Sequence, residues 1–172
     1  AHYLLGCTYR DMGEAPRAID CYLDAAACAD TTAADCDFYT LASIHAQTAH
    51  LYHQQLLLSY EIEEHRKASH YNYLAKDTLH ALYEQKMVAG CYLLQNKKDS
   101  AESLLLNTMR QYQRCGYSQE ALQTSTMLMY LYSVLSDSIQ SIKSLLDKFD
   151  TEYNLYDECH ELYLDYRLFY YS

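Results

Sequence analysis

Apolar residues recur at helical spacing from the start of the chain. Leu4, Leu5 and Tyr9 share one helix face, and this pattern stops at Gly13, a residue that suits a helix end. Pro16 stands where a second helix would begin, the position at which proline costs a helix least. A second stripe with i, i+3/i+4 and i+7 spacing then consists of Ala18, Ile19, Tyr22, Ala25 and Ala26. The pattern predicts two antiparallel helices joined by a short turn.

The rest of the chain repeats this alternation of amphipathic stretches and short polar breaks. We expect long helices over about 36–54, with Asp35 as the cap, and over about 58–74. Asp77 and Thr78 can cap the third unit, and Gly116 separates it from the fourth. Because no linker rich in Pro, Gly or Ser interrupts the pattern, we expect one solenoid domain over 1–172. Its units span about 1–32, 33–74, 75–115 and 116–155, with the first helix of a fifth over 156–172.

A tyrosine marks the register of four successive units. Tyr9, Tyr52, Tyr92 and Tyr132 are separated by 43, 40 and 40 residues. The positions that define the first copy are Leu5, Gly6, Tyr9, Ala18, Tyr22 and Ala25, and later copies keep Ala68 and Ala101. Gly6 against Ala18 and Ala25 predicts two helices that cross closely. The chain is therefore expected to be all-α, with a period of about 40 residues.

The spacing of Leu5, Gly6, Tyr9, Gly13, Ala18, Tyr22 and Ala25 resembles the tetratricopeptide repeat (TPR) family. That resemblance implies a right-handed superhelical solenoid of antiparallel helix pairs that binds proteins or peptides. The stretches over 2–6 and 11–18 are similar to TPR proteins of Bacteroides-type bacteria, which implies the interaction or sensor part of a larger regulatory protein. Because Ala1 already lies inside a motif, we expect the chain to be a fragment of such a protein.

In this family the first helix of each pair lines a concave groove for the partner. The register implies that the groove residues of this chain are Tyr3, Arg10, His50, His53, Gln54, Tyr83, Lys86, Gln123 and Tyr130. Members that clamp a carboxylate carry Asn at positions that here hold Cys7, His50, Gly90 and Tyr130. A clamp for a C-terminal carboxylate is therefore not expected.

Tyrosine is unusually frequent, and its role has two interpretations. The chain contains 20 Tyr. Tyr offers a large contact area with few rotatable bonds, which suits recognition, but buried aromatic residues also fill the cores of helix pairs. For any single Tyr the packing interpretation is favoured. The C-terminal group Tyr163, Tyr166, Phe169 and Tyr170 would be uncovered without a following helix, which predicts self-association there.

Charge and motifs narrow the class of function. The net charge of −10 disfavours direct binding of nucleic acid, and no apolar run reaches the length of a membrane span. No enzyme signature is present, and the acidic run over 61–64 is expected to form an exposed face with i, i+3/i+4 ion pairs. His50 and His53 share a helix face but lack a third ligand, so neither a metal nor a cofactor is expected.

The seven cysteines form no closely spaced pair, which favours small buried side chains in a reducing compartment. The family resemblance also allows a periplasmic or membrane-anchored parent protein. Protein or peptide binding is the favoured function. A sensor for a small ligand such as a saccharide, in the same groove, and an oligomerisation module are the alternatives.

Overall fold

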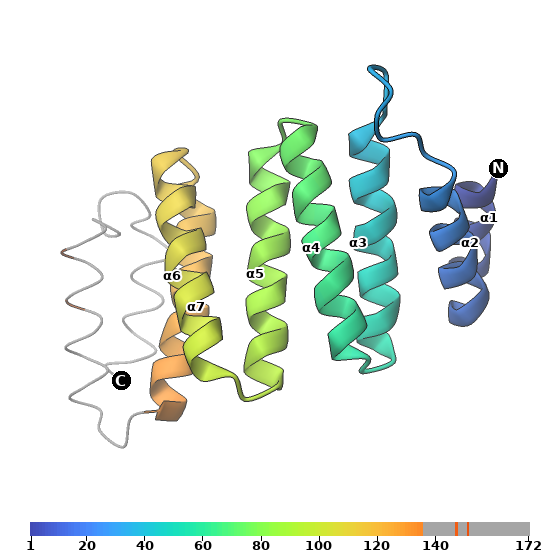
Figure 1. Ribbon diagram of the computed structural model, residues 1–172. Helices are drawn as coiled ribbons and strands as arrows, with labels where there is room; N and C mark the ends of the chain where they lie inside the picture. The colour runs from blue at the N-terminus through green and yellow to red at the C-terminus, as the bar shows by residue number, and fades with distance from the viewer. Residues whose placement is uncertain (136–146, 148–150, 152–172) are drawn as a thin grey trace. The chain divides into compact units, whose positions relative to one another are not determined.

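The computed structural model describes residues 1–135 together with residues 147 and 151, and all regular secondary structure in that part of the chain is helical. Figure 1 shows the helices as successive hairpins. They are α1 (His2–Asp11), α2 (Ala15–Ala27), α3 (Phe38–Gln54), α4 (Leu58–Leu74), α5 (Thr78–Leu94), α6 (Lys98–Arg114) and α7 (Ser118–Leu135). The chain forms two compact units, residues 1–91 and 92–172, and the boundary falls within α5.

The first hairpin is built around a buried tyrosine. Tyr22 of α2 is fully buried, with Ala18 and Ile19 beside it and Ile44 and Leu51 of α3 in the same core cluster. A Cβ atom on Gly6 would lie 2.6 Å from two atoms of the Tyr22 ring. The close crossing was predicted correctly, but the group that demands glycine at position 6 is this ring rather than Ala18 or Ala25.

From α3 onward, each helix begins 20 residues after the one before it, at residues 38, 58, 78, 98 and 118. The residues that end the turns follow the same step, since Leu56, Lys76, Asn96 and Gly116 all have positive φ. In each turn the N–H of the next residue bonds to a helix carbonyl five positions back, as Leu57 does to Tyr52 and Lys97 to Tyr92. This is the Schellman geometry, which satisfies carbonyls left free at a helix end. The 40-residue period is therefore two 20-residue steps.

The register tyrosines occupy equivalent places where they are described. The carbonyls of Tyr9, Tyr52 and Tyr92 each accept the longer hydrogen bond of such a turn, from Glu14, Leu57 and Lys97 respectively. The side chain of Tyr132 lies outside the described residues. The prediction of antiparallel helix pairs in an all-α chain is confirmed over the part that the structure describes.

The second hairpin, α3 with α4, begins later than predicted. Helix α3 starts at Phe38, and its cap is Asp37, whose carboxylate accepts a hydrogen bond from the Thr40 N–H at 3.0 Å. The prediction that Asp35 caps a helix from 36 is therefore wrong by two residues. Asp35 and Asp37 both precede the apolar stripe, and only the Asp37 side chain reaches an N–H three residues ahead.

Burial of α4 contradicts the expected exposed acidic face. Glu63 is the exposed member of the run, and it pairs with Lys67 at 3.2 Å. Glu61 and Glu64 are buried. Helix α4 has α3 on one side and α5 on the other, as shown by the hydrogen bond that Glu64 accepts from His45 and the one that the Ser69 hydroxyl donates to the Ala81 carbonyl. A helix packed on two sides buries more of its circumference than a surface helix does, so charged residues enter the interior if partners meet them there.

In the second unit α6 packs against α7. Ala101, Leu105, Met109 and Tyr112 of α6 are fully buried, and the Tyr112 ring meets Tyr117 edge to face with centroids 6.3 Å apart. Ala101 thus fills the small-residue position that Ala18, also fully buried, fills in the first hairpin. The predicted break at 136–138 and the predicted units beyond it lie outside the described residues.

Candidate functional site

A small pocket lies between the first helices of two successive pairs in the first unit. It has a volume of about 80 Å³. Its lining comes from α3, α4 and α5 and consists of Tyr39, Ala42, Ser43, Ala46, Asn72, His80 and Glu84. Tyr39 and His80 are exposed, whereas Asn72 and Glu84 are buried. The pocket therefore has an aromatic entrance and polar groups at depth.

The pocket exists because four positions carry smaller side chains than their counterparts 40 residues later. Three of the positions are on α3, where Ala42, Ser43 and Ala46 correspond to the larger Leu82, Tyr83 and Lys86 of α5. On α4, Asn72 stands where α6 has the fully buried Tyr112. Close packing leaves no space where each position is filled, so short side chains at adjacent positions open a cavity. This contrast is the sequence signal for the pocket, and none of the predicted groove residues lines it.

The polar groups of the pocket retain unused hydrogen-bonding capacity. The buried side-chain amide of Asn72 has no hydrogen-bond partner among the described residues. Glu84 accepts a hydrogen bond at Oε2 from the Nδ1 atom of His65, 2.5 Å away, and its Oε1 has no partner there. His80 lies 2.7 Å from the Asp77 carboxylate. The Asn72 amide and Glu84 Oε1 are therefore the groups of the pocket that can bond an incoming polar group.

Behind the pocket, buried His–Glu pairs repeat with the same 20-residue step as the helices. His45 Nδ1 lies 2.6 Å from Glu64 Oε2, and His65 Nδ1 makes the equivalent contact with Glu84. His65 also faces Glu61, with 3.7 Å between Nε2 and Oε1. Glu61 in turn contacts the Nδ1 atom of His53 at 2.9 Å, so two carboxylates and two imidazoles form one chain of contacts.

The ion pairs around Glu64 influence its titration. Burial raises the pKa of the Glu64 carboxyl, but hydrogen bonds from His45 and Lys67 lower it by more, so its pKa lies below the ordinary value. Lys67 Nζ lies 2.7 Å from Glu64 Oε1. The carboxylate form is therefore favoured inside the helix array.

The predicted groove residues of the first unit have different surroundings. His50 and Gln54 are exposed and lie 3.1 Å apart between their Nε2 atoms, and His53 is half-exposed with its Nδ1 2.9 Å from Glu61. Tyr83 is exposed, but Lys86 is buried, with its Nζ 5.3 Å from the centroid of the Tyr83 ring. Lys86 thus supports the Tyr83 ring from within and does not present its charge at the surface.

The remaining predicted groove residues do not gather at the pocket. Tyr3 packs on Tyr22, with ring centroids 5.9 Å apart, and Arg10 donates hydrogen bonds to Asp11 and Gln47. In the second unit Gln123 and Tyr130 of α7 are exposed. The self-association surface expected at Tyr163, Tyr166, Phe169 and Tyr170 lies outside the described residues.

Packing was the favoured interpretation for any single tyrosine, and the described tyrosines divide between packed and exposed side chains. Tyr22 and Tyr112 are fully buried. Five others are exposed, namely Tyr39, Tyr60, Tyr73, Tyr83 and Tyr130. The packing interpretation holds for the first two and for the partly buried Tyr3, Tyr9 and Tyr52, which pack against the core cluster of the first hairpin, and the exposed group retains the recognition interpretation.

The cysteines are less buried than predicted. Cys91 is buried, but Cys28 and Cys115 are exposed and Cys7, Cys21 and Cys36 are partly exposed. Cys28 and Cys115 are C-cap residues, where a helix ends at the surface, and periodicity alone does not reveal this. Burial, with a hydrogen bond to Glu61, raises the pKa of the Cys91 thiol to about 12.

The described residues contain no group of three or more His, Cys, Asp or Glu side chains arranged to hold a metal ion. His45, near in sequence to His50 and His53, is buried against Glu64. None of the described helices has the length and apolar character needed to cross a membrane.

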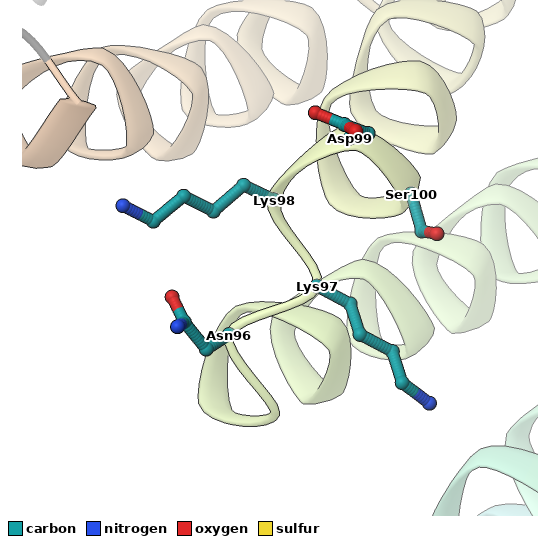
Figure 2. A pocket seen from close by; sticks show the side chains of 5 residues that line it. All are labelled: Asn96, Lys97, Lys98, Asp99 and Ser100. Carbon is teal, nitrogen blue, oxygen red and sulfur yellow. The ribbon is translucent and has the colours of Figure 1, made fainter.

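A second hollow follows the turn between α5 and α6 and is lined by Asn96, Lys97, Lys98, Asp99 and Ser100. Figure 2 shows that Lys97 and Lys98 point in opposite directions. The Lys97 ammonium lies 5.8 Å from the centroid of the Tyr92 ring, so it contacts that ring rather than the hollow. Five consecutive residues whose side chains diverge do not converge on a ligand, so this hollow is a surface feature of the turn.

No protein-family model matches the chain, and no curated protein matches it. Among solved structures, a kinesin light chain-like protein of Podospora anserina with nearly identical TPR-like repeats is similar, with 14% sequence identity and a TM-score of 0.45. The alignment covers 94% of this chain and 88% of that one.

Proposed function

We propose that this chain is a TPR-like helical scaffold that binds a protein or peptide on the surface formed by the first helices of its pairs. The observation that carries the proposal is the α3–α5 surface of the first unit, where exposed Tyr39 lines the pocket and Tyr83 of α5 is also exposed. Exposed aromatic side chains beside a pocket suit recognition of a partner chain, since they bury large areas at low entropic cost. The residue register of the TPR motif supports the same surface.

The volume of the pocket favours a peptide over a small-molecule ligand. Sites for drug-sized ligands occupy roughly 300–1,000 Å³. At about 80 Å³, this pocket suits one side chain of a longer partner. The proposal extends to a larger bacterial regulatory protein in which this chain supplies the interaction part, an extension that rests on the resemblance of the first unit alone.

The test is selection of binders from a random peptide library with the 172-residue chain, followed by affinity measurement on two double variants. Tyr39→Ala with Tyr83→Ala removes both aromatic rings from the proposed surface, and we expect binding to weaken at least about tenfold, or roughly 1.4 kcal/mol. The matched control is Tyr60→Ala with Tyr73→Ala, two exposed tyrosines of α4.

Tyr39 and Tyr60 make a close comparison because each is 59% exposed. Far-UV circular dichroism of both variants confirms that the helices remain. Equal loss of affinity in the two variants, or no selected peptide at all, would contradict the proposed surface.

A further inference from the structure

We infer that the pocket between α3 and α5 receives a single basic side chain, a lysine or arginine, of the bound partner. This inference rests on the proposed function, because it specifies the chemistry of a partner that the same surface binds. It is carried by the pocket-lining carboxylate of Glu84 and the unpartnered amide of Asn72.

The charges around the pocket select a cation. Glu84 is the carboxylate in the lining, and its Oε1 remains able to accept a hydrogen bond. Its partner His65 also faces Glu61, which the His53 imidazole contacts in turn, and no lysine or arginine is among the described residues that line the pocket. At the entrance His80 is matched by Asp77. A carboxylate away from bulk water attracts a cation more strongly than an exposed one, because the surroundings screen the charge less.

The other lining groups suit the same ligand. The Asn72 carbonyl oxygen and the Ser43 hydroxyl can both accept hydrogen bonds from an ammonium or guanidinium group, which only donates. The exposed Tyr39 ring can cover the aliphatic stem or contact the cation through its face. The overall charge of −10 adds long-range attraction for a basic partner.

Size sets the part of the ligand that enters. The volume of about 80 Å³ is well below that of a site for a drug-sized ligand, which occupies roughly 300–1,000 Å³. One side chain of the partner can therefore enter the pocket. The remainder of the partner would lie outside, across Tyr39 and Tyr83.

The direct test is a titration of the ¹⁵N-labelled chain with Nα-acetyl-lysine methylamide, followed by NMR. The matched probe is Nα-acetyl-norleucine methylamide, which has the same stem without the ammonium group. A single side chain buries little surface, so we expect dissociation constants on the order of 1–10 mM for the lysine compound. The Asn72 side-chain amide signals should shift with the lysine compound and not with the norleucine compound.

Two variants locate the effect. Asn72→Tyr installs the residue that α6 carries at the equivalent position and fills the pocket without changing the charge, so the lysine-dependent shifts should disappear from the pocket backbone amides. Tyr60→Ala changes an exposed tyrosine outside the pocket and should leave those shifts as they are. If Asn72→Tyr does not fold, Ala46→Leu provides a second way to fill the pocket from α3.

The outcomes separate this inference from the proposed function. Identical shifts with the lysine and norleucine compounds, or lysine-dependent shifts that persist in a folded pocket-filling variant, would overturn the basic-side-chain inference. Library peptides that bind through Tyr39 and Tyr83 without any preference for lysine or arginine would also overturn it, while leaving peptide binding itself in place. Selected peptides that lose at least about tenfold in affinity when one lysine or arginine becomes norleucine would support it.

Discussion

At the scale of single residues, three of the turns between helices hold a non-glycine residue in the strained left-handed backbone conformation. Leu56, Lys76 and Asn96 adopt positive φ at positions that glycine holds in the turns at Gly13 and Gly116. The left-handed conformation costs a non-glycine residue roughly 1–2 kcal/mol, because its Cβ approaches the following carbonyl oxygen. Leu56 accepts this cost although its side chain is 76% exposed and contributes little packing.

We therefore expect Leu56→Gly to stabilise the protein by about 1 kcal/mol, since the strain disappears and few contacts are lost. The measurement is urea unfolding followed by circular dichroism at 222 nm. The control is Leu94→Gly, the same substitution at another exposed leucine. Leu94 is the last residue of α5, and its backbone is helical. There glycine should destabilise by roughly 0.5–1 kcal/mol. Changes of the same sign in both variants would show that backbone strain at position 56 is not the dominant effect.

At the scale of helices, α4 is held between its neighbours by buried ion pairs as well as by apolar contacts. Glu64 connects α4 to His45 of α3, and His65 connects it to Glu84 of α5. Pairs of this kind contribute little if they are simply exchanged for apolar residues, but loss of one member leaves the other buried and uncompensated. The helix array should therefore be sensitive to any change that neutralises one partner.

Acidification is such a change, and the sign follows from the lowered pKa of Glu64. Because that pKa is lower in the folded chain than the ordinary 4.5, the unfolded chain binds the proton first as pH falls. The stabilisation is complete above the ordinary value and disappears as pH falls through the folded value. Thermal melts between about pH 6 and about pH 3 should therefore show a steeper loss of Tm for the unaltered chain than for Glu64→Gln.

Glu63→Gln is the control for that experiment. Glu63 is the adjacent acid on α4 and also pairs with Lys67, but its side chain is exposed. Exposed pairs contribute little to stability, so this variant should follow the pH profile of the unaltered chain. Parallel profiles for all three proteins would mean that acid sensitivity arises elsewhere.

At the scale of the whole molecule, reactivity of the cysteines reports how firmly the helices pack. Cys91 is buried and its thiol pKa is raised to about 12, so near pH 8 it should react with iodoacetamide only when the packing opens. Exposed Cys28 and Cys115 should react at least about a hundredfold faster. Peptide-resolved mass spectrometry over a time course measures this ratio, and addition of denaturant should abolish it. Similar native rates at Cys91 and Cys28 would contradict the burial of Cys91.

Local sequence patterns were enough to predict the helices and most of their ends. Interactions within one or two helical turns determine the apolar stripe around Ala18 and Tyr22, the helix start at Pro16 and the break near residue 96. The spacing of residues in the sequence is sufficient to predict such features. The 40-residue tyrosine spacing also identified the repeat, because the carbonyls of Tyr9, Tyr52 and Tyr92 each close the same kind of turn. The finer 20-residue step was missed because alternate helices carry different side chains at equivalent positions, such as Tyr52 and Asn72.

What the sequence by itself determined is thus the set of helices, their pairing by short turns and the period of the array, since these follow from local backbone preferences and apolar periodicity. Tertiary structure alone decided which polar residues are interior. Glu61, Glu64 and Lys86 read as surface residues on an isolated helix, and they are buried because a neighbouring helix covers the face that periodicity assigns to solvent. The pocket has the same origin, since it arises where short side chains on α3 and α4 meet Glu84 of α5, and such a void depends on what three helices bring together.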